Sequence, residues 1–68
     1  MRDLLDHSHT HLNKSVINRL ARIESQVKSI RTMVEKGRDC SEVLIQVGAA
    51  RAALDQAGRL ILKDHMEQ

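Results

Sequence analysis

Cys40 and His65 are the two side chains of this sequence best suited to hold a soft metal ion together. They are twenty-five residues apart, and the stretch between them contains no proline. If one helix spans them, a rise of about 1.5 Å per residue puts them roughly 37 Å apart. One ion cannot bridge them within a chain. Two copies of this helix packed antiparallel would bring Cys40 of one chain beside His65 of the other, twice by symmetry.

Each of these residues also has a simpler interpretation. Cys40 can be a small apolar residue at a helix start, and His65 a surface histidine at a helix end. A helix N-terminus favours the thiolate, and Arg38 adds positive charge next to it. One sulfur and one nitrogen suit two-coordinate Cu(I), and a third soft ligand would improve the site. On a helix that ligand would fall one turn after His65, beyond Gln68.

Three alternating histidines near the N-terminus, His7, His9 and His11, form a second candidate site. Imidazoles at this spacing can share a metal ion. If His7, His9 or His11 folds back toward Cys40 and His65, the nitrogen-rich set suits Ni(II) or Co(II). The alternative is a flexible, solvated tail over residues 1–11.

Two amphipathic helices are expected to position these residues. The first runs from about Leu12 to Lys36, and Gly37 ends it in a left-handed conformation. Asp39 caps the second, which runs to Met66, and Glu42 completes a capping box. Each carries apolar residues at alternating steps of four and three: Val16, Leu20, Ile23, Val27, Ile30 and Val34, then Val43, Val47, Ala50, Leu54, Ala57 and Ile61. The short connection predicts an all-α antiparallel hairpin with a long second helix.

The second helix is apolar on more sides than one neighbour can cover. Gly48, Gly58 and several alanines allow other helices to approach closely. Arg51 and Asp55, one turn apart, are expected to pair with each other or across an interface. We therefore expect a dimer with a four-helix core, and a tetramer built from two dimers.

A basic stripe on the first helix is the candidate DNA surface. Arg19, Arg22, Gln26 and Ser29 follow one another at steps of three and four, and Lys14, Lys28 and Arg31 add charge nearby. Glu24 is the only carboxylate between Thr10 and Val34. Arginine and glutamine suit phosphates and base edges. The alternative is an ordinary solvated face, which doubling in an oligomer would make broader and more basic.

Composition narrows the possible functions. The chain has 68 residues, a net charge of +2, one cysteine and 0% aromatic residues. These values fit a single domain, exclude an internal disulfide and disfavour base stacking on single strands. The sequence has no membrane span, no signal peptide and no nucleophile–base pair or phosphate loop. We expect a cytoplasmic protein that is not an enzyme and has no small organic substrate.

The run from Ile17 to Leu54 and the later Ile-Leu-Lys-Asp-His segment resemble the CsoR/RcnR family of bacterial metal-responsive repressors. The carrying motifs are R-x-x-R-I-x-x-Q-V, G-R-D-C, and a histidine twenty-five residues after that cysteine. Ser25 stands where the family usually has glycine.

The resemblance implies a helical subunit that forms dimers and tetramers, binds operator DNA when metal-free, and releases it on ligand binding. It implies that Cys40 and His65 are metal ligands shared between subunits. His9 or His7 would match an N-terminal ligand used by the nickel and cobalt members. Arg19, Arg22 and Arg51 would act in DNA binding or its control. Residues 12–68 are the expected DNA-binding and metal-sensing domain. The family's third ligand and its short third helix have no counterpart within these residues.

The function predicted from sequence is a repressor that leaves double-stranded operator DNA when Cu(I) binds between subunits. One alternative is a Ni(II) or Co(II) sensor that uses the N-terminal histidines. A second is a metal-independent sensor whose Cys40 thiol reacts with sulfide-derived species or an aldehyde. A third is a plain helical oligomerisation module.

Overall fold

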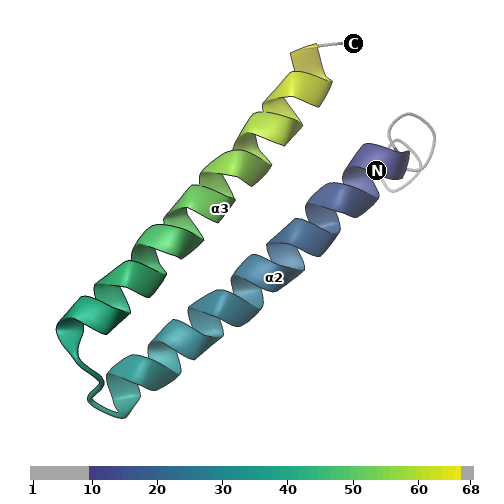
Figure 1. Ribbon diagram of the computed structural model, residues 1–68. Helices are drawn as coiled ribbons and strands as arrows, with labels where there is room; N and C mark the ends of the chain where they lie inside the picture. The colour runs from purple at the N-terminus through teal and green to yellow at the C-terminus, as the bar shows by residue number, and fades with distance from the viewer. Residues whose placement is uncertain (1–9, 67–68) are drawn as a thin grey trace.

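The computed structural model describes residues 10–66, which form a hairpin of two antiparallel helices (Figure 1). α2 spans Thr10–Glu35 and α3 spans Cys40–Met66. The helices lie side by side and give the hairpin extents of 46 × 19 × 15 Å. No strand occurs in the described part of the chain. The predicted all-α hairpin is confirmed.

The start of α2 differs slightly from the prediction. The helix begins at Thr10, two residues before Leu12, and ends at Glu35 rather than Lys36. Nothing between Thr10 and Leu12 disfavours helix, because that stretch contains neither glycine nor proline. Residues 10 and 11, which were expected in the N-terminal tail, therefore belong to α2. Residues 1–9 lie outside the described residues.

The turn between the helices is built on Gly37. Its φ of +69° is the left-handed conformation that closes a helix, as predicted. The Arg38 amide donates to the Met33 carbonyl at 2.9 Å, and the Gly37 amide donates to the Val34 carbonyl at 3.1 Å. These two bonds form a Schellman motif, which satisfies carbonyls at the end of α2 and sends the chain back along it.

Asp39 caps the start of α3, as expected, but the predicted capping box with Glu42 does not form. The Asp39 carboxylate accepts hydrogen bonds from the Ser41 amide, at 3.2 Å, and from the Ser41 hydroxyl. The Glu42 carboxylate accepts from the Arg38 guanidinium at 2.8 Å instead of reaching back to the Asp39 amide. A charged donor one turn away competes successfully because charge-assisted hydrogen bonds are stronger than neutral ones.

The core between the helices is small. Val16 and Ile23 of α2 pack against Ala50 and Ala57 of α3, and Ala57 is only 1% exposed. Alanine at two of these four positions lets the helices approach closely. So small a core provides little hydrophobic stabilisation, and chains of this length usually need a partner or a staple.

Each predicted heptad seam splits between two environments. Some members face the opposite helix, whereas others remain 39–61% exposed along one side of the hairpin. We call this side the open apolar face; its residues are Leu20, Val27 and Val34 of α2 with Val47, Leu54 and Ile61 of α3. One helix covers only part of an apolar stripe on its neighbour, so the rest of each seam is available to another chain.

The glycines of α3 are not required by the hairpin. A Cβ atom added at Gly48 or Gly58 would meet nothing within 4 Å. Their small size is therefore available for the approach of a second chain. Over residues 10–66, neither helix is both long enough and apolar enough to cross a membrane.

Candidate metal and DNA sites

Cys40 is the first residue of α3 and its side chain is exposed. It borders a hollow at the turn end of the hairpin, which Val34, Arg38, Val43 and Leu44 also line. The thiol is therefore accessible to a metal ion or a second chain and is not a buried core residue.

The charges around Cys40 differ from the expectation that Arg38 makes this site positive. Arg38 is paired with Glu42, and the two groups are spaced by one helical turn, which is the sequence signal for such a pair. Hydrogen bonds from the Ser41 side chain and backbone lower the pKa of Asp39, so this carboxylate stays ionised next to Cys40. Two carboxylates and one guanidinium leave the surroundings without net positive charge.

His65 lies in the last turn of α3 and is also exposed. At about 100° per residue, twenty-five residues bring it back to within roughly 20° of Cys40 around the helix axis. Val47, Leu54 and Ile61 follow Cys40 at successive steps of seven, and His65 comes four residues after Ile61. Cys40 and His65 therefore mark the two ends of the α3 edge of the open apolar face.

A single chain does not assemble a metal site from these residues. Among the described residues, no three His, Cys, Asp or Glu side chains gather where they could hold one ion. Cys40 and His65 lie at opposite ends of a helix of 27 residues. His7 and His9 lie outside the described residues, so their part in a metal site stays a prediction.

Three residues of the predicted basic stripe lie together. Arg19, Arg22 and Gln26 line one cavity of about 210 Å³ with Ile23 and with Ala53 of α3. Arg19 and Gln26 are half-buried against α3, whereas Arg22 is exposed. This arrangement holds two guanidinium groups and an amide on the side of the hairpin away from the open apolar face.

Lys14 lies apart from this cluster. It is exposed and precedes Arg19 by five residues, which turns it by about 140° around α2. It can extend the basic surface only around the outer side of the helix.

Arg51 lies on the other side of the hairpin from Arg19 and Arg22. It borders an apolar groove with Val27, Val47 and Leu54. Within one protomer Arg51 therefore shares a surface with the open apolar face and not with the basic stripe.

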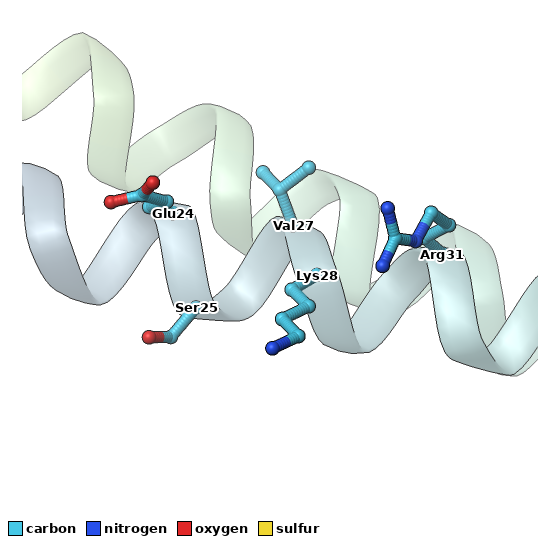
Figure 2. Close-up of a pocket in the computed structure, with 5 residues that line it drawn as sticks. All are labelled: Glu24, Ser25, Val27, Lys28 and Arg31. Carbon is cyan, nitrogen blue, oxygen red and sulfur yellow. The ribbon is translucent and has the colours of Figure 1, made fainter.

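Lys28 and Arg31 also lie apart from the stripe. They border a different hollow with Glu24, Ser25 and Val27 (Figure 2). Arg31 pairs with Glu35 at 3.9 Å, and both side chains are largely exposed. Because Glu24 lies in this group, the cavity formed by Arg19, Arg22 and Gln26 has no carboxylate in its lining.

Arg51 and Asp55 do not pair with each other within the protomer. The described residues contain two ion pairs between residues four apart, Arg31–Glu35 in α2 and Arg38–Glu42 at the start of α3. Arg51 and Asp55 have the same spacing and are both exposed. The predicted pairing within one chain is therefore not formed, which leaves the predicted pairing across an interface.

Comparison with known proteins identifies the family of this chain. Residues 12–68 match the family described as metal-sensitive transcriptional repressor. The chain is 39% identical over 61 residues to the copper-sensing transcriptional repressor CsoR of Bacillus subtilis, covering 90% of this chain and 60% of that protein. It is 33% identical over 60 residues to the copper-sensing transcriptional repressor RicR of Mycobacterium tuberculosis, covering 88% and 62%. The chain thus spans about three fifths of the length of these relatives.

A solved structure extends the likeness to the fold. The Copper-Sensing Operon Regulator Protein (CsoRGz) superposes with a TM-score of 0.77 at 54% sequence identity, over 79% of this chain and 90% of that one. The resemblance to the CsoR/RcnR repressors is confirmed, and these proteins are regulators rather than enzymes. The chain belongs to the family of metal-sensitive transcriptional repressors.

Proposed function

We propose that this chain is the sensing and DNA-binding part of a copper-responsive repressor, which leaves its operator when Cu(I) binds between two subunits. One observation carries the proposal. Cys40 and His65 lie on the same side of α3, at its two ends, beside an apolar face that the described residues leave exposed. Burial of that face against a second copy brings the two donors together.

The pairing has a definite register. When Cys40 of one chain lies opposite His65 of the other, Leu44 lies opposite Ile61 of the second copy, and Val47 lies opposite Gly58. The first contact joins two exposed aliphatic side chains. In the second, Val47 meets a glycine with open space around it. The register that forms the site thus also buries apolar surface, at about 25 cal/mol per Å².

The donor set fits copper better than nickel or cobalt. Each symmetric site receives one thiolate sulfur and one imidazole nitrogen, which suit the soft, low-coordinate Cu(I) ion. A Cu(I) ion held there would tie the start of one α3 to the end of the other. The CsoR and RicR relatives are both copper-sensing repressors. A Ni(II) or Co(II) site would need His7 or His9 as additional ligands.

The proposed DNA surface is the cluster of Arg19, Arg22 and Gln26, extended by Lys14. A dimer contains twice as many of these cationic side chains as one chain, and a tetramer contains four times as many. Guanidinium groups and an amide suit the phosphates and base edges of a duplex. Arg51 is left out of this surface because it lies on the opposite side of the hairpin.

The proposed coupling runs through the α3–α3 contact. Cys40 and His65 are fixed to the ends of the long helices, so joining them sets how the two hairpins lie against each other. The spacing of the two basic clusters along DNA changes with that arrangement. A coupling of about 1–3 kcal/mol would weaken DNA binding roughly 5- to 150-fold.

The test is a fluorescence anisotropy titration of Cu(I) into the protein bound to labelled promoter DNA under anaerobic conditions. Wild type should release the DNA, whereas Cys40→Ala and His65→Ala should bind DNA normally and stay bound. Lys63→Ala, two residues from His65 but on the outer side of α3, is the matched control and should respond like wild type. Unchanged release from Cys40→Ala would overturn the site.

The exposed thiol supports a second candidate, a sensor in which Cys40 itself reacts with a persulfide or an aldehyde. The same titration with these reagents separates the two. In a thiol sensor His65→Ala keeps the full response and Cu(I) has no effect.

A further inference from the structure

Arg51 and Asp55 carry opposite charges in the middle of α3. Both side chains are exposed, and neither pairs with the other in the described part of the protomer. Among the described residues, two pairs with the same sequence spacing form, Arg31–Glu35 at 3.9 Å and Arg38–Glu42 at 2.8 Å. Two others, Glu24–Lys28 and Asp55–Arg59, do not. Spacing alone therefore does not decide whether such residues pair within one helix.

Arg51 occupies a position where an unpaired charge is costly once a second chain binds. It lies in the groove formed by Val27, Val47 and Leu54, near the middle of the open apolar face. Covering that face removes water from the guanidinium. A buried charge without a partner destabilises an interface strongly, so a dimer needs an acceptor at this point.

The register that joins Cys40 to His65 supplies the acceptor. In that register Arg51 lies opposite Leu54 of the second copy, and Asp55 of that copy is one residue further along. The offset along the helix axes is about 1.5 Å, compared with about 6 Å between Arg51 and Asp55 of the same chain. The two Arg51 residues also come within about 4.5 Å of each other along the axis, so without the acidic partners they would repel.

We propose that Arg51 of each chain pairs with Asp55 of the other, and that these two crossed ion pairs select a second copy of this chain and fix the register that aligns Cys40 with His65. The inference rests on the α3–α3 pairing of the proposed function. It gives Arg51 a role in assembly, distinct from direct contact with DNA.

Two single charge reversals test the crossed geometry. Arg51→Asp gives a chain with two acids at these positions, and Asp55→Arg gives a chain with two arginines. Each homodimer then holds two like-charge contacts, whereas the mixed dimer holds two attractive ones. Both residues are exposed and outside the buried core, so circular dichroism should show hairpins that remain helical, alone or after mixing.

The measurement is native mass spectrometry of the two variants, one carrying a mass tag, before and after mixing. The ratio of mixed dimer to homodimers should exceed its statistical value by about tenfold or more, and the double reversal should dimerise like wild type. If the singles are unfolded alone, recovery of helix on mixing supports the pairing equally.

Two outcomes would overturn the inference, and they differ in what else they overturn. If wild type dimerises, either of two results removes the crossed pairs and leaves the proposed copper site intact. One is a statistical mixture; the other is that single variants unfolded alone gain no helix on mixing. A monomeric wild type removes the α3–α3 pairing itself and the proposed function with it.

Discussion

Replacing Leu54 by alanine should weaken the dimer without damaging the hairpin. Leu54 is 53% exposed in the protomer and lies at the centre of the open apolar face. Full burial of a leucine side chain is worth about 1.5–3 kcal/mol, so roughly half of that, about 1 kcal/mol, remains to be gained at an interface. Two chains contribute the residue, which gives about 2 kcal/mol per dimer.

This energy corresponds to an increase of about 30-fold in the dimer dissociation constant. Sedimentation equilibrium over a range of protein concentrations measures it, with circular dichroism at each concentration to follow helix content. Ile45→Ala is the matched control. Ile45 is 68% exposed, but it precedes Leu54 by nine residues and so lies about 180° away on the outer side of α3. Its substitution should change dimerisation by less than about threefold.

Comparing the two variants shows whether the open apolar face is the dimer interface. Equal weakening by Leu54→Ala and Ile45→Ala would mean that apolar area in general, and not the open apolar face, drives dimerisation. A dissociation constant unaffected by Leu54→Ala would mean that the face is not the interface.

Three further predictions concern the turn, the cap and the DNA surface. Gly37→Ala forces a side chain into the left-handed conformation and should cost about 1–2 kcal/mol, which thermal unfolding would record as a fall of several degrees in Tm. The pKa of Asp39 is below its ordinary value of 3.8, so its contribution to stability is present above that value and is lost as pH falls through the folded-state pKa; Asp39→Asn should remove this part of the acid sensitivity in pH-dependent unfolding. Arg22→Ala should lower the slope of log affinity against log salt concentration by about one for each DNA phosphate that it no longer neutralises, whereas Lys28→Ala should leave that slope unchanged.

Much of the fold follows from local patterns in the sequence. Gly37 identifies the turn because the left-handed closing conformation favours glycine, and the heptad steps identify both helices. The partners of individual charges are less predictable. Glu42 has two possible partners at suitable spacing, the Asp39 amide and the Arg38 side chain, and side-chain geometry decides between them.

For the candidate site, the sequence predicts that two chains are needed but does not predict which residues share a surface. The length of α3 alone shows that Cys40 and His65 cannot meet within one chain. Which residues share a surface depends on how the helices pack. The family resemblance groups Arg51 with Arg19 and Arg22, but the packing of α3 against α2 turns Arg51 toward the open apolar face.

The central claim is that each copper site is shared by two chains. The most direct test is to mix two variants that each lack one of the two ligands. Heterodimers of Cys40→Ala and His65→Ala chains, isolated through two different affinity tags, should contain one intact Cys40–His65 pair and one empty pair. A Cu(I) titration against a competing chelator should then find one tight site per heterodimer, two per wild-type dimer and none in either variant alone. Heterodimers that bind no more Cu(I) than the separate variants would contradict the account.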